Sequence, residues 1–246
     1  MIVPTGFILA MTFLTRLPMP KVVNFQPSDM TKAVVWFPLA GMVVGGLVAG
    51  FWWLGNLVHP ILAGLLGLLV WVWVTGALHL DGLSDLVDAL GAAHANEERF
   101  FKVLEDPHVG SFGVVALVLQ LLAKLILLTL LANVDMSAWW LVFVAAWARL
   151  GAAWWSLSLP SIKPGLGETF AWQGKVSQLG WGLGALTLTS LILSPLLLSA
   201  LVPVILWRVW LKWRLGGQTG DALGAGIELS ESVTLLLLVI IIQSLV

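Results

Sequence analysis

Apolar runs of about twenty residues recur along the whole chain with short polar links between them, and this pattern constrains the fold most. Four runs are clear before residue 160, at residues 34–54, 61–80, 112–131 and 139–159. Each is long enough to cross the hydrocarbon core of a bilayer as an α-helix. The mean hydropathy of +0.99 and the charged fraction of 10% indicate the same class. We therefore expect an all-α, polytopic transmembrane helical bundle and exclude a soluble enzyme.

The number of crossings depends on the run at residues 179–207, which can be one span or two. Lysine and arginine occur in the loops at 15–31, 92–111 and 160–175, whereas the links at 55–60 and 133–137 have neither. Because basic loops stay in the cytoplasm, Arg208, Lys212 and Arg214 require two crossings, broken near Ser194 and Pro195. The sequence thus predicts about seven spans in a single domain, residues 1–246, plus a short N-terminal interfacial or re-entrant helix at residues 2–14.

Small residues and tryptophans within the apolar runs give more local predictions. Gly41 and Gly45, like Gly46 and Gly50, stand four residues apart, a spacing that lets helices approach closely. Tryptophan doublets at 52–53, 139–140 and 154–155 lie near the ends of runs, where Trp commonly anchors a helix at the headgroups. Residues 207–213 interleave Trp with cations, a pattern typical of a helix lying in the membrane interface.

Acidic residues concentrate at residues 79–113, which hold seven of the thirteen carboxylates. Asp81, Asp85 and Asp88 stand at i, i+4 and i+7, so a helix places them within an arc of about 60°. Such a stripe repels itself unless a cation lies between the carboxylates. Oxygen ligands favour a hard ion, Mg²⁺ or Mn²⁺, over zinc. A solvated acidic face on an amphipathic helix is the alternative interpretation.

A second acidic pair, Asp221 and Glu228, lies seven residues apart and therefore also shares a helical face. The glycines Gly216, Gly217 and Gly220 come just before it or at its start. Glycines ahead of a helix N-terminus expose backbone N–H groups that can hold phosphate, although an ordinary helix start explains them equally well. The charge asymmetry of the loops places this pair on the same side of the membrane as the first three aspartates.

Two cations, Lys124 and Arg149, fall inside predicted spans. A cation at that depth is expensive and usually faces the bundle interior, so both are candidate substrate contacts. Pairing with a buried aspartate, or reaching back to the interface, is the alternative for each. Two acidic clusters, a glycine-rich helix start and cations together favour metal-dependent phosphoryl transfer from a diphosphate.

Other chemistries lack their markers in this chain. There is no cysteine, no G-x-S-x-G elbow and no H-E-x-x-H helix, which argues against covalent acyl transfer and zinc hydrolysis. The net charge of −1 gives no sign of nucleic-acid binding. Because intramembrane carboxylates also line ion pathways, a cation-coupled transporter stays open as a non-enzymatic alternative.

Several motifs, spread almost end to end, resemble one known family. They are FLTRLPMP at 13–20, WFPLAGMVVGG at 36–46, HLDGLSDLVD at 79–88, GSFG at 110–113, Arg149 in the fourth span and GGQTGDALGAGIEL at 216–229. Together they resemble the cobalamin synthase family, the adenosylcobinamide-GDP ribazoletransferases. The resemblance implies Mg²⁺-dependent transfer of the adenosylcobinamide phosphate group from adenosylcobinamide-GDP to α-ribazole or its 5′-phosphate, with release of GMP. It also implies the prokaryotic cytoplasmic (inner) membrane, an active site facing the cytoplasm, and as further partners other enzymes of nucleotide loop assembly or a second copy of the chain.

Roles for individual residues follow from the resemblance as expectations. It implies Asp81, Asp85, Asp88 and Asp221 as catalytic residues, and these four with Glu228 as metal ligands. With the candidates drawn above from membrane depth and from the glycine-rich helix start, the expected substrate contacts are His79, Asp106, His108, Lys124, Arg149, Gly216, Gly217 and Gln218.

Two positions depart from the family pattern. Where the family usually reads D-S-R-x-G, this chain has Asp106-Pro107-His108-Val109-Gly110, and Ala89 replaces the glycine after the third aspartate. Protonated His108 can take the place of the missing arginine at a phosphate, or Arg99 or Lys102 can. We interpret His94 as a loop residue and not as a ligand.

The nearest competing enzyme class is that of the CDP-alcohol phosphotransferases, which carry D-G-x-x-A-R with a downstream D-x-x-x-D. Here Asp81 and Gly82 are followed by Leu83, Ser84 and Asp85, so the alanine and the arginine of that motif are missing.

Overall fold

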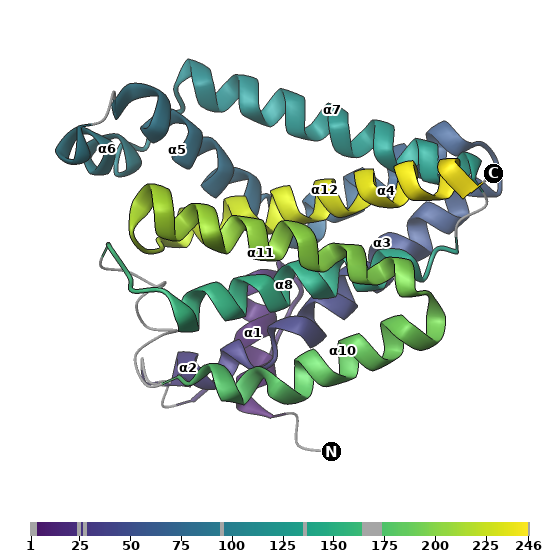
Figure 1. The fold of residues 1–246 in the computed structure, drawn as a ribbon, viewed down its shortest axis with the longest axis horizontal. Helices are drawn as coiled ribbons and strands as arrows, with labels where there is room; N and C mark the ends of the chain where they lie inside the picture. Colours follow the sequence, from purple (N-terminus) through teal and green to yellow (C-terminus); the bar gives the residue numbers. More distant parts are fainter. Residues whose placement is uncertain are drawn as a thin grey trace.

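The computed structural model describes residues 4–23, 26, 29–93, 96–134, 137–163 and 174–245, and within these ranges the chain is a bundle of helices without a β-strand (Figure 1). In chain order the elements are α1 (Thr5–Leu14), α2 (Asp29–Val34), α3 (Phe37–Asn56), α4 (Pro60–Thr75), α5 (Leu78–Ala93), α6 (Glu97–Leu104), α7 (Ser111–Asn133), α8 (Trp140–Ser158), η1 (Val176–Leu179), α10 (Gly180–Leu193), η2 (Pro195–Ala200), α11 (Leu201–Trp210), η3 (Leu211–Leu215) and α12 (Gly220–Leu245). His94 lies outside the described residues.

Six helical stretches are long and apolar enough to cross a membrane: α3, α7, α8, Val176–Leu193, Pro195–Leu215 and Gly220–Ser244. The pair α4 and α5, bent by 84° at its break, is a seventh candidate if its two helices form one span. The spans run between two ends of the molecule, one with the chain's C-terminus and the other with α6 (Figure 1). The prediction of an all-α polytopic bundle is confirmed, and the run at residues 179–207 is divided at Ser194 into two helical stretches, each long and apolar enough for one crossing.

The break between α4 and α5 positions α5, the helix that carries Asp81, Asp85 and Asp88. Gly76 and Ala77 both adopt left-handed backbone conformations, with φ of 62° and 60°. Their N–H groups donate to the carbonyls of Trp73 and Val72, and the N–H of Arg16 donates to Val74 O at 2.8 Å. The last carbonyls of α4 are therefore satisfied inside the bundle, as a nonpolar surrounding requires. The expected short N-terminal helix is α1. Arg16, in the segment after α1, makes the hydrogen bond to the end of α4.

The helix α8 forms the centre of the bundle, and nearly all of its residues are buried. It packs closely on α3 at Gly41, where an added Cβ would lie 2.6 Å from Ala145 O, and at Gly45, where it would lie 2.6 Å from Leu141 O. The first glycine pair therefore packs helices as predicted. The same prediction for Gly46 and Gly50 is wrong, because both face open space.

Tryptophan indoles link helices within the bundle. Trp52 is buried and donates to Leu128 O at 3.0 Å, and Trp155 is buried and donates to Val204 O at 2.9 Å. The prediction that the Trp doublets are anchors at the headgroups is therefore wrong for these two members. Trp53 and Trp139 are exposed.

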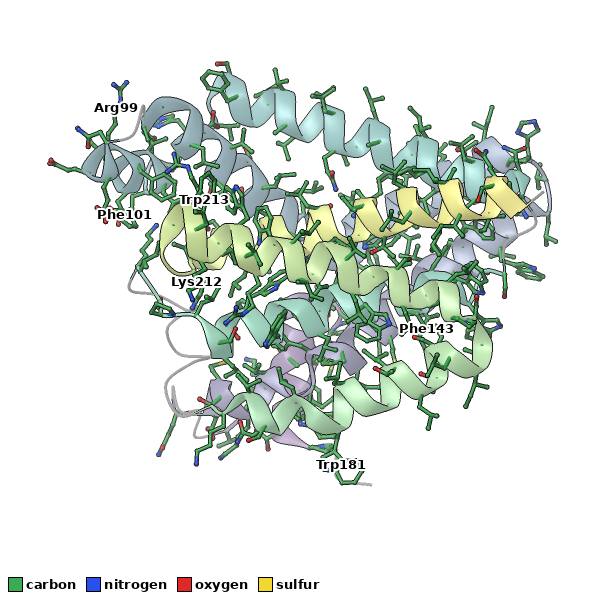
Figure 2. The ribbon with its side chains drawn as sticks, in the orientation of Figure 1. Arg99, Phe101, Phe143, Trp181, Lys212 and Trp213 are labelled. Carbon is green, nitrogen blue, oxygen red and sulfur yellow. The ribbon has the colours of Figure 1, made fainter. Side chains whose placement is uncertain are left out.

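The segment at residues 207–213 does not form a separate interfacial helix. It continues the span Pro195–Leu215 through α11 and the π-helical turn η3. Trp207 donates its indole N–H to Ala222 O at 3.1 Å, which fixes this span against the start of α12. Lys212 and Trp213 follow at the end of the bundle that also carries α6 and Arg99 (Figure 2).

Candidate active site

Two glycines bring α5 against α12. A Cβ added at Gly82 would lie 2.8 Å from Asp221 O, and one added at Gly224 would lie 3.3 Å from the Cα of His79. Only glycine permits this approach of the two backbones. As a result the charge of Asp221 acts on Asp85, in addition to the charges of Asp81 and Asp88 on the same helix as Asp85. The two acidic segments, 140 residues apart in the sequence (221 − 81), meet as the sequence predicted.

Asp81, Asp85 and Asp221 differ in how far they reach the solvent. The side chain of Asp81 is exposed, and those of Asp85 and Asp221 are half-buried. Three carboxylates crowded at a helix contact repel one another and require positive charge nearby.

Lys163 supplies the positive charge that the sequence did not assign to this site. Its charge acts on both Asp85 and Asp221. Its ammonium group donates to Leu104 O at the end of α6, at 3.3 Å, and its side chain is half-buried. In the sequence Lys163 is one lysine of a polar loop, so no spacing or motif distinguished it.

The glycine-rich link before α12 is held by the chain itself. The N–H of Gln218 donates to Pro160 O at 2.9 Å, and the N–H of Ile162 donates to Gln218 O at 3.1 Å. A Cβ at Gly217 would lie 2.4 Å from Pro160 O, and Gly216 adopts a left-handed conformation with φ 73°. This link therefore fixes the segment that carries Lys163 beside α12. Its geometry explains Gly216, Gly217 and Gln218 without a phosphate, because the Gln218 N–H is already used.

Asp88 caps the start of α7. Its Oδ2 accepts from the N–H of Gly110 at 2.7 Å and its Oδ1 accepts from the N–H of Gly113 at 2.9 Å. Added Cβ atoms at these glycines would lie 2.3 and 2.2 Å from the same carboxylate. The spacing of the G-S-F-G motif follows from this contact, since the first N–H groups of a helix need acceptors. Asp88 is buried and uses both oxygens here, so it differs from Asp81 and Asp85, with which the sequence grouped it.

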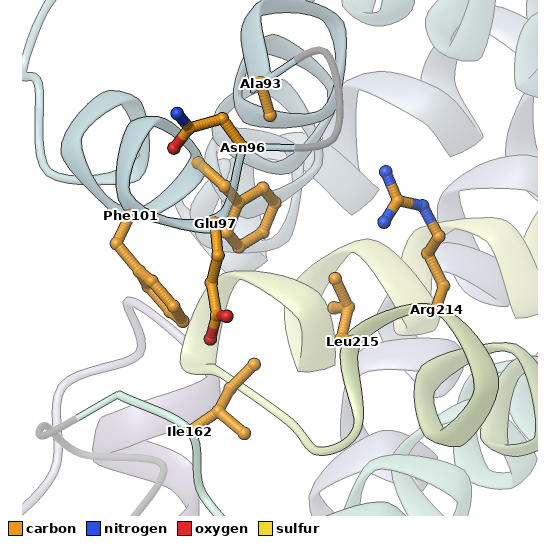
Figure 3. Close-up of a pocket in the computed structure, with 8 residues that line it drawn as sticks. Ala93, Asn96, Glu97, Phe101, Ile162, Arg214 and Leu215 are labelled. Carbon is orange, nitrogen blue, oxygen red and sulfur yellow. The ribbon is translucent and has the colours of Figure 1, made fainter.

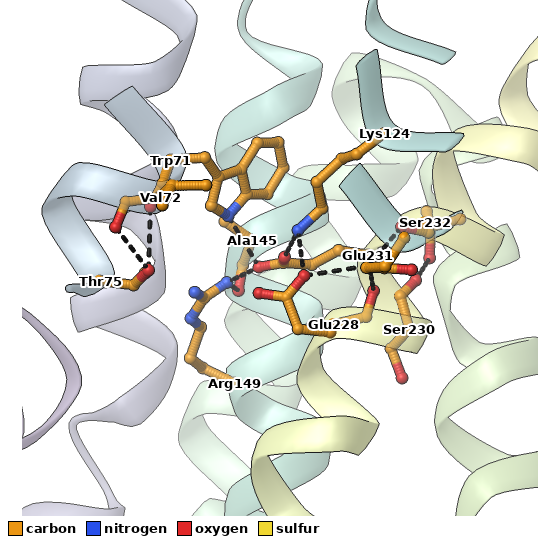
Figure 4. A network of polar contacts seen from close by, with 12 residues as sticks. Trp71, Val72, Thr75, Lys124, Ala145, Arg149, Glu228, Ser230, Glu231 and Ser232 are labelled. Atoms are coloured by element: carbon orange, nitrogen blue, oxygen red, sulfur yellow. Dashed lines mark hydrogen bonds and ion pairs between the residues drawn. The ribbon is translucent and has the colours of Figure 1, made fainter. Parts of the chain in front are cut away.

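A second set of charges lies inside the bundle (Figure 4). Lys124 Nζ pairs with Glu228 Oε2 at 2.7 Å and with Glu231 Oε2 at 2.5 Å. Arg149 Nη1 pairs with Glu231 Oε1, which also accepts from the indole N–H of Trp71 at 3.1 Å. Two cations and two carboxylates balance one another, and all four are buried. We call Lys124, Arg149, Glu228 and Glu231 the buried charge network.

The buried charge network gives partners to residues that the sequence assigned to substrate or metal. Glu228, proposed as a metal ligand, is bonded to Lys124 and accepts from Gln120 Nε2 at 3.0 Å. Lys124 and Arg149 are structural partners of buried acidic residues, as the alternative interpretation had it, but the partners are glutamates and not the expected aspartate. Glu231 was missed, although its i, i+3 spacing from Glu228 places both on one helix face.

We call Asp81, Asp85 and Asp221 the acidic surface. His79 lies between this surface and the buried charge network. It is buried, and neither of its ring nitrogens has a hydrogen-bond partner among the residues described here. The Nε and Nη2 atoms of Arg149 are likewise unpaired within the described chain. Buried polar atoms nearly always have partners, so these nitrogens call for a bound water or a ligand group.

Asp106 and His108 lie in the exposed loop between α6 and α7. The backbone N–H of His108 donates to Asp106 Oδ1 at 3.0 Å and its ring Nδ1 lies 2.7 Å from the same oxygen. The backbone hydrogen bond first, and then the ring contact, hold the pKa of Asp106 below its usual range. Asp106, Arg99 and Lys102 line an open cavity of about 410 Å³, so these cations lie beside the position of the missing arginine.

The oxygens of the acidic surface suit Mg²⁺ or Mn²⁺ only if other ligands complete the site. Within the described residues, no three Asp, Glu or His side chains converge on a single metal position. Mg²⁺ keeps several waters and is usually bound by one or two carboxylates together with substrate phosphates. The donors Asp81, Asp85 and Asp221 are hard oxygens of like charge beside one another, which fits an ion that arrives with a diphosphate.

The fold and this surface define the class: a polytopic integral membrane enzyme whose acidic residues gather where two helices meet at one end of the bundle. The chain belongs to the cobalamin-5-phosphate synthase family (CobS), whose family model matches residues 6–239. It is 56% identical to the adenosylcobinamide-GDP ribazoletransferase of Thiobacillus denitrificans, over 94% of both chains. The enzymes of the same name from Laribacter hongkongensis and Novosphingobium aromaticivorans are 52% identical over 96% of both chains and 48% identical over 94% of both chains. No solved structure is significantly similar to the chain. The resemblance inferred from the motifs is thereby confirmed.

Proposed function

We propose that this chain transfers the adenosylcobinamide phosphate group from adenosylcobinamide-GDP to α-ribazole or its 5′-phosphate and releases GMP. The names of the relatives support this activity. The observation that carries it is the contact of α5 with α12 at Gly82, which gathers Asp81, Asp85 and Asp221 beside Lys163. A diphosphate needs a cation and a proton acceptor at the same place, and this surface supplies both.

In the proposed reaction a ribose hydroxyl of the acceptor attacks the phosphorus next to adenosylcobinamide. A new P–O bond forms, the bond to the GMP phosphate breaks, and GMP leaves with the electron pair. One aspartate of the set accepts the proton of the attacking hydroxyl. The Lys163 ammonium binds phosphate oxygens and offsets the charge that develops on the leaving group.

Mg²⁺, or Mn²⁺ in its place, would be held by one or two carboxylates of the set Asp81, Asp85 and Asp221 together with phosphate oxygens, and when bound it would neutralise the diphosphate. We do not assign Asp88 and Glu228 to this ion, because Asp88 caps α7 and Glu228 is paired with Lys124. The buried nitrogens of His79 and Arg149 that lack partners in the described chain would bind a water or a substrate group.

We also propose that the chain resides in the cytoplasmic membrane with the acidic surface facing the cytoplasm. The distribution of lysine and arginine supports this orientation, because the loops beside α6 carry them and the opposite links do not. Reporter fusions after Asn56 and after Trp213 should report opposite sides of the membrane. If both reported the same side, the orientation and the crossing count would fail together.

The activity is tested with purified protein in detergent or lipid, supplied with Mg²⁺, adenosylcobinamide-GDP and α-ribazole. We expect GMP release and a joined product in the wild type, no GMP release in Asp85→Asn, and unchanged release in Glu105→Gln, whose exposed side chain follows the end of α6. Near-wild-type activity of Asp85→Asn would overturn the assignment of the acidic surface. Metal uptake into vesicles without GMP release would favour the transporter instead.

A further inference from the structure

A cavity of about 270 Å³ lies beside the acidic surface, between α6, the segment at residues 160–163 and the end of η3 (Figure 3). Its lining combines two phenylalanines, two aliphatic side chains and two opposite charges: Phe100, Phe101, Ile162, Leu215, Glu97 and Arg214. Figure 3 shows the Glu97 carboxylate directed between Phe101 and Ile162, with Arg214 across the cavity. An apolar pocket with a few convergent polar groups is the usual form of a small-molecule site.

The chemistry of this lining matches a planar, polar ring. Aromatic side chains stack on nucleobases, and a carboxylate accepts hydrogen bonds from neighbouring ring and exocyclic N–H groups. Arginine donates to the O6 and N7 acceptors of guanine. Guanine is the nucleobase that presents two adjacent N–H donors on one edge and two adjacent acceptors on another.

The cavity also lies at a suitable distance from the acidic surface. Ala93 lines the cavity and stands eight residues after Asp85 on the same helix, which is about 12 Å along the axis. Ile162 lines it as well, and the next residue is Lys163, whose charge acts on Asp85 and Asp221. The base and the terminal phosphate of one extended nucleotide can therefore reach the two places together.

We propose that this cavity binds the guanine base of the diphosphate donor, with Glu97 accepting from its N1–H and N2 amino groups and Arg214 donating to its acceptors. This inference rests on the proposed function and names the group that anchors the donor. The base of α-ribazole is a benzimidazole without an N–H donor, so it offers the Glu97 carboxylate no hydrogen bond, whereas guanine offers two. Because Glu97 is exposed to solvent, its carboxylate favours guanine by the hydrogen bonds it gains from the base.

The test compares the binding of GDP and IDP, which differ only in the N2 amino group, to purified protein in detergent. We expect the wild type to prefer GDP by about tenfold or more, as one good base contact provides. Glu97→Gln should lose that preference and raise KM for adenosylcobinamide-GDP while KM for α-ribazole stays unchanged. The matched control is Glu98→Gln, a change in the same first turn of α6.

Equal binding of GDP and IDP by the wild type would overturn the proposal. So would an effect of Glu97→Gln that matches that of Glu98→Gln, or one that appears in KM for α-ribazole. Equal melting temperatures of the two variants show that both are folded, and Phe101→Leu, which removes the stacking ring, should weaken GDP and IDP binding alike. Because nucleotide binding is measured without turnover, a wild type that prefers GDP but releases no GMP would refute the proposed function and leave the guanine site intact.

Discussion

The strongest stability prediction concerns Glu231, the carboxylate that joins both cations of the buried charge network. It accepts from Lys124, Arg149 and Trp71, and its side chain is completely buried. Glu231→Gln keeps the shape but leaves two buried cations with one carboxylate, Glu228. Breaking a buried ion pair on one side costs about 3–5 kcal/mol. At about 2–4 °C per kcal/mol for a chain of this size, the melting temperature should fall by about 6–20 °C.

The assay is thermal unfolding in detergent, followed by tryptophan fluorescence, with Glu98→Gln as the exposed control. The double variant Glu231→Gln/Arg149→Met restores charge balance, since Lys124 then pairs with Glu228 alone. It should therefore melt no lower than Glu231→Gln, because residues in one network are not additive. A single variant that melts with the wild type, or a double variant that loses the sum of both single effects, would refute the charge-balance reasoning.

Three further predictions separate structural from reactive positions. Asp88→Ala should lower the free energy of unfolding by about 0.5–2 kcal/mol because the cap of α7 is lost. Asp85→Asn should unfold no earlier than the wild type because it relieves repulsion between carboxylates, and chemical unfolding in detergent checks both variants. Gly41→Leu should prevent the close packing of α3 on α8 and reduce the yield of folded protein, whereas Gly46→Leu should leave it unchanged, as size-exclusion profiles would show. Lys163→Met should raise KM for adenosylcobinamide-GDP about tenfold or more and should also lower the melting temperature, because it removes the cation beside three carboxylates; an unchanged KM would remove Lys163 from the site.

The span pattern could be predicted from the sequence because bilayer thickness and charge asymmetry act on whole segments. The division at Ser194 depended on this asymmetry: a single span would have placed Arg208 and its neighbours on the wrong side. The meeting of Asp85 with Asp221 was predictable for the same reason, since both segments had to end on one side of the membrane.

Pairings between particular side chains could not be predicted, because they depend on helix rotation and depth. Asp88 shares a stripe with Asp81 and Asp85 in the sequence, but the start of α7 comes to it and occupies both its oxygens. Gly46 has the same spacing as Gly41, yet it faces away from the neighbouring helices. Hydrophobic runs without a strong periodicity contain too little information to fix such rotations.

The two groups of carboxylates differ in how their charge is compensated, and this difference assigns their roles. Inside the bundle, Glu228 and Glu231 are matched by Lys124 and Arg149, so the network can be buried without an additional ion. The acidic surface, where α5 meets α12, has three carboxylates: Asp81, Asp85 and Asp221. Among the described residues, Lys163 is the one cation whose charge acts on Asp85 or Asp221. The close packing at Gly82 and Gly224 holds these like charges together, although a larger separation of α5 and α12 would reduce their repulsion. An arrangement that is costly for the free protein and is relieved by a metal-bound diphosphate is expected where ligands bind, since functional sites are commonly less stable than the structure around them.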